Sequence, residues 1–244
     1  MIRQIRAELL KIRSTRTTLG LVLGMVALVL LFVLLTGFLA DVEGLSSKGD
    51  QLNYLGLGSL AALFAALAGT LVVTSEYRFG TIRPTIIFNP RRTQVVGAKL
   101  VASMLAGLVF AVVGMGLSYG IGRWILSGRS ISFALDGGDV AQLLLGALAA
   151  AALWGAIGVG LAAILRNQIA SVVGLIAWSL LVENLLFGLV PKIGRFTPGR
   201  ASDALMGMTT DHLLSGVAGA AVLVAWVAVL AVAGIVLTAR RDVD

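Results

Sequence analysis

The polar residues that could carry a function gather in residues 74–99, between two long apolar segments. Away from the chain ends, this is the only long polar interruption that carries several charges on the predicted inner side of the protein. It contains a carboxylate, a glycine turn, prolines and cations. The serines of the whole chain have no histidine or lysine partner at a spacing that is typical of nucleophilic catalysis. These residue types favour a mechanical contact with another protein over nucleophilic catalysis.

Each part of this stretch has its own physical role. Glu76 ends an apolar segment, where an unpaired carboxylate is costly unless Arg78 or an arginine of the N-terminal region neutralises it. Gly80 allows a sharp change of direction, and Thr81 can cap a short helix whose first turn accommodates Pro84. The sequence therefore predicts a turn followed by a short helix.

The predicted short helix has an apolar surface that is too short to cross a bilayer. Its members are Ile82, Ile86, Ile87 and Phe88. Pro90 then stops the segment, while Arg91, Arg92 and Lys99 anchor the start of the next apolar segment. We expect a short helix parallel to the membrane and tied to two spans, which could transmit a push. The alternative is an ordinary basic loop that only fixes topology.

Other chemistry has little support in the sequence. There is no G-x-x-x-x-G-K-[ST] phosphate loop, so we expect no ATP hydrolysis of that kind in this chain. Cys is absent, and His212 is the single histidine, which favours a solvated side chain over a catalytic or metal-binding one. We therefore expect no catalytic residue, no metal site and no cofactor in the chain itself.

Glu183 is the only acidic residue well within an apolar segment. It lies about 14 residues into that segment, roughly 21 Å along a helix, and hence in the outer half of a membrane. There it could reach lipid headgroups or pair with Lys192 or Arg195. A substrate gate and a plain interfacial charge both remain open.

The composition is that of a membrane protein. Hydrophobic residues make up 58% of the 244 residues and charged residues 13%, compared with roughly 25% charged in soluble domains. The mean hydropathy is +0.98. Six apolar segments are close to the ~20 residues that cross a bilayer. They cover approximately residues 19–40, 52–75, 95–121, 140–165, 169–188 and 213–239. The sequence thus predicts an all-α polytopic membrane protein with six transmembrane helices in a single domain, residues 1–244.

The distribution of charge predicts the orientation. Lys and Arg are more frequent on the side that holds the N-terminal region, residues 76–94 and the C-terminal end, and the acidic residues favour the other side. Because basic loops stay in the cytoplasm, both termini should be cytoplasmic and the protein should lie in the cell membrane. The net charge of +7 is explained by these loops, so we expect no nucleic-acid partner.

Two further segments have a predicted shape. Residues 1–18 form an amphipathic interfacial helix, in which an apolar stripe faces the acyl chains and the cations lie mostly off it. The stripe consists of Ile2, Ile5, Leu9 and Ile12, and the cations are Arg3, Arg6, Lys11 and Arg13. The alternative is a basic topology signal without defined shape. Residues 189–212 contain Pro191, Pro198 and basic residues among apolar ones, which predicts short helices dipping into the outer leaflet.

The loop resembles a known family. Its residues fit the E-x-x-x-G-T-(I/L)…P-x-R…K pattern of the membrane subunits of type 2 ABC exporters, with Glu76, Gly80, Thr81, Ile82, Pro90, Arg92 and Lys99. The start of the chain is similar to that of many such subunits, particularly actinobacterial ones, through Ala7-Glu8-Leu9-Leu10-Lys11, Arg13 and Arg16. The resemblance extends over the whole chain in length, six spans and a partly re-entrant segment before the last span. Pro84 departs from it, because many relatives carry leucine there.

The resemblance implies a mechanism. Two copies of a separate ABC ATPase would hold ATP and Mg and would dock on the N-terminal helix and the loop. A second membrane subunit, identical or homologous, would complete the unit in the lipid bilayer. The implied coupling residues are Glu76, Arg78, Gly80, Thr81, Ile82, Arg83, Pro90, Arg92 and Lys99, with Ile5, Glu8, Leu9, Lys11 and Arg13 in the N-terminal helix. The implied outer-gate candidates are Glu183, Pro191 and Pro198.

The expected function is export of a hydrophobic or amphiphilic drug, lipid or peptide by a non-catalytic subunit. A membrane-embedded enzyme is the alternative from another class, but it needs polar catalytic residues that converge at membrane depth. A secondary transporter predicts broken spans and carboxylates in mid-membrane, neither of which the sequence pattern indicates. An assembly factor without an ATPase partner is also compatible with the sequence.

Overall fold

The computed structural model describes residues 1–88 and 91–240, which form helices joined by short connections and contain no strand. The predicted all-α class is confirmed. The elements are α1 (Ile2–Ser14), α2 (Arg16–Leu39), η1 (Glu43–Leu45), α3 (Lys48–Leu55), η2 (Gly56–Leu60), α4 (Ala61–Arg78), α5 (Ile82–Phe88), α6 (Arg92–Gly128), α7 (Gly137–Leu165), α8 (Gln168–Ala177), η3 (Trp178–Val182), α9 (Glu183–Leu189), α10 (Pro191–Gly194), α11 (Pro198–Leu205) and α12 (Gly216–Arg240).

Six helical stretches of the described chain are long and apolar enough to cross a membrane. They are Arg16–Leu39, Lys48–Arg78, Arg92–Gly128, Gly137–Leu165, Gln168–Leu189 and Gly216–Arg240. Each contains most or all of one segment predicted from the sequence, with boundaries displaced by a few residues. These spans indicate a multi-pass membrane protein.

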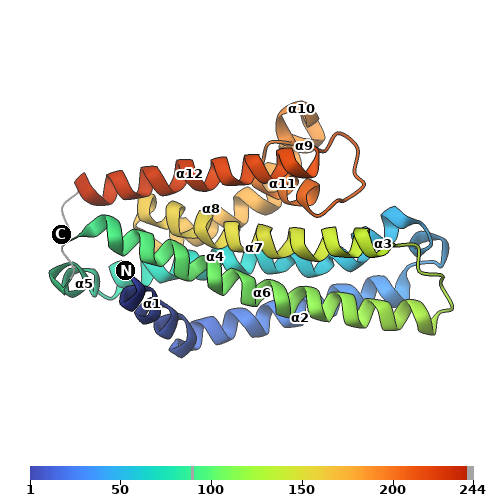
Figure 1. The fold of residues 1–244 in the computed structure, drawn as a ribbon, viewed down its shortest axis with the longest axis horizontal. Coiled ribbons are helices and arrows are strands. Elements are labelled where there is room, and N and C mark those ends of the chain that lie inside the picture. Colours follow the sequence, from blue (N-terminus) through green and yellow to red (C-terminus); the bar gives the residue numbers. More distant parts are fainter. Residues whose placement is uncertain (89–90, 241–244) are drawn as a thin grey trace.

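The long helices run side by side along the long axis of the molecule, and both chain ends lie at the same end of it (Figure 1). That end also carries α1 and α5, whereas α3 lies at the opposite end (Figure 1). Helix α7 packs most extensively, against α4, α6 and α12. The bundle thus has a central helix, and the N-terminal helix and the short α5 both sit at the end of the bundle that holds the termini.

Small residues allow the central helices to approach closely. A Cβ atom added at Gly158 of α7 would lie 2.0 Å from the carbonyl oxygen of Ala66 in α4, and one added at Gly69 would lie 2.2 Å from the carbonyl oxygen of Gly155. Real Cβ atoms do not come so near to backbone, so these positions admit only glycine at this spacing. Close backbone approach of this kind is how helices associate in lipid.

Two of the spans are irregular, which the sequence interpretation did not anticipate. The second span consists of α3, the 3₁₀ segment η2 and α4. The fifth consists of α8, the π-helical segment η3 and α9. Short π segments within α-helices occur often at functional sites. Both spans remain continuous helices, and the irregular segments only change the local helical geometry within them.

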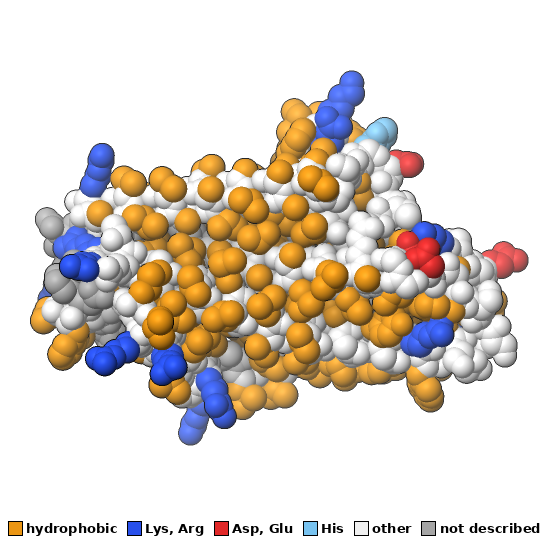
Figure 2. Space-filling view, viewed as in Figure 1, with side chains coloured by type: hydrophobic (Ala, Val, Ile, Leu, Met, Phe, Trp, Pro, Cys, Tyr) orange, Lys and Arg blue, Asp and Glu red, His pale blue; other side chains and the backbone are white. Residues whose placement is uncertain are grey.

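The surface of the bundle divides into three zones along its long axis. On the face shown in Figure 2, a broad apolar zone covers the middle of the molecule, Lys and Arg side chains gather towards the end with the termini, and the visible Asp and Glu side chains lie at the opposite end. A broad apolar zone between charged ends is the surface expected of a protein embedded in a bilayer.

Candidate functional site

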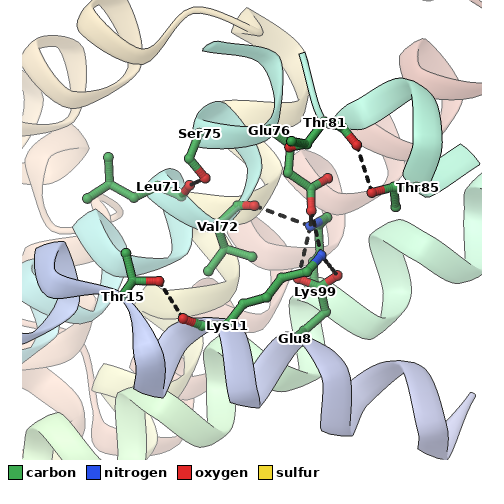
Figure 3. Close-up of polar contacts among 10 residues, drawn as sticks. All are labelled: Glu8, Lys11, Thr15, Leu71, Val72, Ser75, Glu76, Thr81, Thr85 and Lys99. Carbon is green, nitrogen blue, oxygen red and sulfur yellow. Dashed lines mark hydrogen bonds and ion pairs between the residues drawn. The ribbon is translucent and has the colours of Figure 1, made fainter. Parts of the chain in front are cut away.

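Four charged side chains from three helices meet near the end of the bundle that holds the termini (Figure 3). Lys99 of α6 donates to Glu76 Oε1 of α4 over 2.8 Å and to Glu8 Oε2 of α1 over 3.0 Å. Lys11 of α1 donates to Glu76 Oε1 over 2.8 Å and to Glu8 Oε1 over 3.0 Å. The third contact of Lys99 is the Val72 carbonyl, at 3.2 Å. We call Glu8, Lys11, Glu76 and Lys99 the charge cluster.

The charge cluster is buried except on one side. Glu8, Glu76 and Lys99 are 2%, 5% and 2% exposed, whereas Lys11 is an exposed residue. Burial opposes the charge of the Lys11 ammonium, but the hydrogen bonds and charges of Glu76 and Glu8 outweigh it and raise the pKa of Lys11. Two carboxylates and two ammonium groups balance, so the cluster can be buried without a net charge.

The partners of Glu76 differ from those predicted. Arg78 is exposed, donates to Gln168 Oε1 at 3.4 Å and lies over the ring of Phe79, and it does not pair with Glu76 in the described chain. Lysines neutralise Glu76 instead, because Lys11 and Lys99 reach it from both neighbouring helices. Lys99 was expected to anchor a span at the membrane surface, and that expectation is wrong, because its ammonium is buried in the charge cluster.

The N-terminal helix α1 is amphipathic, as predicted, but most of its apolar stripe faces the protein, and only Ile2, at its start, is exposed. Ile5, Leu9 and Ile12 pack with Ala102 and Ala106 of α6 rather than pointing to acyl chains. Glu8 lies on the same buried side, where it meets Lys99. The predicted orientation toward lipid is therefore wrong, since the carboxylate needs a cation that α6 supplies. Arg13 is exposed, as expected for a cation off the stripe.

The predicted turn and short helix are present after α4. Gly80 has φ +68°, a left-handed conformation that favours glycine, and α5 begins two residues later. Ile82 is buried, whereas Thr81 and Arg83 are exposed. Arg92 donates to the Thr238 carbonyl of α12 over 3.2 Å, which ties the start of α6 to the last span. The predicted stop at Pro90 lies outside the described residues.

An open cavity of about 600 Å³ lies beside the charge cluster. Residues of α1, α4 and α5 line it, among them Lys11, Glu76, Thr85 and Phe88. Oε2 of Glu76 is buried and has no hydrogen-bond partner within the part of the chain that the structure describes. The cavity and the exposed residues of α5 thus lie side by side at this end of the bundle.

The outer-gate candidates lie in the fifth span and the segment after it. Pro191 and Pro198 are the first residues of α10 and α11, where a missing N–H costs nothing. Glu183 is only 3% exposed, and it accepts a hydrogen bond from the Gly199 N–H over 2.7 Å. It forms no ion pair with Lys192 or Arg195 in the described structure, so both predicted environments, headgroups and basic partners, are wrong.

The described residues contain no group of three or more His, Cys, Asp or Glu side chains that could hold a metal ion. Comparison with protein-family models and with curated proteins finds no match to this chain. The arrangement of its own residues is therefore the basis for assigning a function.

Proposed function

We propose that this protein is the membrane-spanning subunit of an ATP-driven exporter of the type 2 ABC class, with a separate ATPase that docks at the end of the bundle holding α1 and α5. The observation that carries the proposal is the charge cluster, which joins three helices directly beside α5 and the open cavity. The resemblance of residues 76–99 to the loop of such subunits supports the same assignment.

The charge cluster makes the three helices respond together. A push on α1 acts through Glu8 on Lys99, and a push on α5 acts through the Gly80 turn on Glu76, which contacts the same lysine. Separating the buried charges is costly, so the helices would move as a unit. Such a connection converts a contact at one end into a shift of the spans.

Helix α5 presents the features of a docking element. Ile87 and Phe88 are 78% and 89% exposed, although both are large apolar residues. Arg83 is also exposed. An apolar tip beside a basic side chain fits a groove on a partner with acidic edges. In this proposal two ATPase copies bind two membrane subunits, identical or homologous.

The proposed orientation places α1 and α5 in the cytoplasm, where ATP is available. Lys and Arg gather towards this end on the face shown in Figure 2, and basic residues favour the cytoplasmic side of membrane proteins. The outward end would then carry the acidic loops. The pathway would accept a hydrophobic or amphiphilic molecule, because the bundle interior is mostly apolar.

The test is co-expression with the ATPase encoded by an adjacent reading frame, followed by purification of the membrane fraction. We expect a stable complex whose ATPase activity requires both chains. Glu76→Ala should weaken the complex or uncouple hydrolysis from export, whereas Glu43→Ala, which removes an exposed carboxylate in η1, should leave both unchanged.

Two outcomes would contradict the proposed function, and a third would remove the coupling role of Glu76 from it. Absence of complex formation with any ATPase would favour an assembly factor. Turnover of a lipid or peptide by the purified chain alone would favour a membrane-embedded enzyme. Normal coupling in Glu76→Ala would reduce residues 76–94 to a topology signal.

A further inference from the structure

A second open cavity, separate from the charge cluster, lies between helices of the bundle. It has a volume of about 310 Å³ and is lined by α4, α7, the fifth span and α11. The charged residues among its described lining are Glu183, Arg200 and Asp203. A volume near 300 Å³ is at the lower limit of small-molecule sites. We call it the outer pocket.

The carboxylate of Glu183 is incompletely partnered in the outer pocket. Its Oε2 accepts the hydrogen bond from the Gly199 N–H, at the start of α11. Its Oε1 is buried and has no hydrogen bond of good geometry to any described residue, although the Trp178 and Thr197 side chains come close enough to interact with the carboxylate. The Thr197 hydroxyl donates instead to the Gly194 carbonyl over 2.8 Å. A buried carboxylate oxygen without a partner is costly, so this atom has a free acceptor position for a ligand.

The cation of the outer pocket is already engaged by other groups. Arg200 donates to Asp203 Oδ2 over 3.0 Å and to Asn184 Oδ1 over 2.6 Å, and its guanidinium lies over the ring of Phe187. It makes no ion pair with Glu183 among the described contacts. Two carboxylates facing one guanidinium leave the pocket with a negative charge when both are ionised, which favours a cationic occupant.

The π-helical segment η3 shapes the wall of the pocket that carries Glu183. The Glu183 N–H donates to the Trp178 carbonyl five residues earlier, which shifts every later side chain around the helix axis. The side-chain amide of Asn184 donates to the Ser179 and Leu180 carbonyls at 3.4 and 3.0 Å. The Ser179 hydroxyl also lines the pocket and has no partner among the described residues.

We propose that the outer pocket binds the protonated amine of an amphiphilic molecule, whose N–H group donates a hydrogen bond to the carboxylate of Glu183. Apolar side chains supply the rest of the wall, among them Leu60, Leu63 and Met206. Leu180 and Asn184 line the same pocket and are exposed, so an alkyl tail can leave the pocket towards the lipid between them. This inference rests on the proposed export function, because it names the class of molecule that the exporter would carry.

The experiment uses the purified full chain in nanodiscs of zwitterionic lipid, without an ATPase. A bromoalkylamine is titrated, and quenching of tryptophan fluorescence reports its approach to Trp154, which lines the pocket, and to Trp178. A bromoalkanol of the same chain length is the neutral control, and empty nanodiscs measure partitioning into lipid. We expect saturable quenching by the amine alone.

Glu183→Gln removes the charge but retains an oxygen that can accept the Gly199 hydrogen bond, and Glu43→Gln is the matched control. We expect Glu183→Gln to weaken amine binding about tenfold or more, since a charge-assisted hydrogen bond is lost. If Glu183→Gln does not fold, Gly199→Ala serves as the second variant. Equal amine affinity in wild type and variant, or equal binding of amine and alkanol, would overturn the proposal. Because no ATPase is present, failure of ATPase docking would leave this result unaffected.

Discussion

Lys99 donates a hydrogen bond to Oε1 of Glu76 over 2.8 Å, and both side chains are almost completely buried. The two residues lie on different helices that a turn and α5 connect. The ion pair therefore fixes the geometry on both sides of α5. A buried pair of this kind contributes specificity of arrangement, and removal of one partner leaves the other charge uncompensated.

Lys99→Ala should destabilise the protein, because Glu8 and Glu76 would then share only Lys11. We expect a loss of about 3 kcal/mol in the free energy of unfolding, at the lower end of the range for breaking a buried pair. Thermal unfolding in nanodiscs measures it. Lys48→Ala is the control, since the Lys48–Asp139 pair at 2.7 Å has a half-exposed lysine and should have a barely detectable effect. Equal effects of the two substitutions would show that the charge cluster does not hold the helices together.

The hydrophobic pattern was sufficient to predict the fold class and the six spans, because each span is a long apolar run bounded by polar or charged residues. It did not predict the 3₁₀ and π segments. Gly56 and Gly58 in the second span were a signal of irregularity, since neither favours a helix interior. The π segment Trp178–Val182 has no such signal, because its residues are compatible with an α-helix.

The residues of the candidate site were found from the sequence, but their partners were not. Glu8, Lys11, Glu76 and Lys99 were each named as members of the N-terminal helix or the loop. Their assembly depends on how α1 packs against α4 and α6, which a single sequence does not encode in its spacing. Likewise, Glu183 was identified as unusual, but its neighbours in the outer pocket were not predicted. Arg200 and Asp203 lie in the segment 189–212, for which the sequence predicted only short helices.

The Gly80 turn should be required for coupling. Gly80→Val forces a β-branched residue into a left-handed conformation, at a strain of about 1–3 kcal/mol, which would move α5 rather than unfold the spans. We expect normal membrane insertion but weakened ATPase binding or hydrolysis uncoupled from export. Gly116→Val is the matched control, because Gly116 has open space around its Cβ position among the described atoms and no positive φ. Normal coupling of ATP hydrolysis to export in Gly80→Val would refute the role of the turn.

The orientation can be tested directly, because the chain contains no cysteine. Arg83→Cys places a thiol on α5, and Glu43→Cys places one at the opposite end, both at exposed positions. A membrane-impermeant maleimide applied to intact cells should label only the cysteine at position 43. After permeabilisation it should label both. Labelling of position 83 in intact cells would show the opposite orientation, with α5 and the proposed ATPase docking site outside the cell.

Gly199 should be required for the position of the Glu183 carboxylate. A Cβ atom at Gly199 would lie 2.1 Å from Glu183 Oε2, so Gly199→Ala must displace the carboxylate while retaining its charge. Because the displaced atom is the end of a flexible side chain, we expect the fold to persist. The hydrogen bond from the Gly199 N–H to Glu183 Oε2 should be lost, and the carboxylate, which belongs to the lining of the outer pocket, should turn.

We therefore expect Gly199→Ala to weaken bromoalkylamine binding several-fold in the tryptophan-quenching assay, with little change in the thermal unfolding midpoint. Gly188→Ala is the matched control in the neighbouring α9, since the described structure has no atom within 4 Å of a Cβ there. Glu183 could either hold the start of α11 in place or receive the amine, and these two roles predict opposite results. If it only holds the start of α11, Gly199→Ala will lower the unfolding midpoint and leave amine affinity intact. If it receives the amine, affinity will fall in both Gly199→Ala and Glu183→Gln.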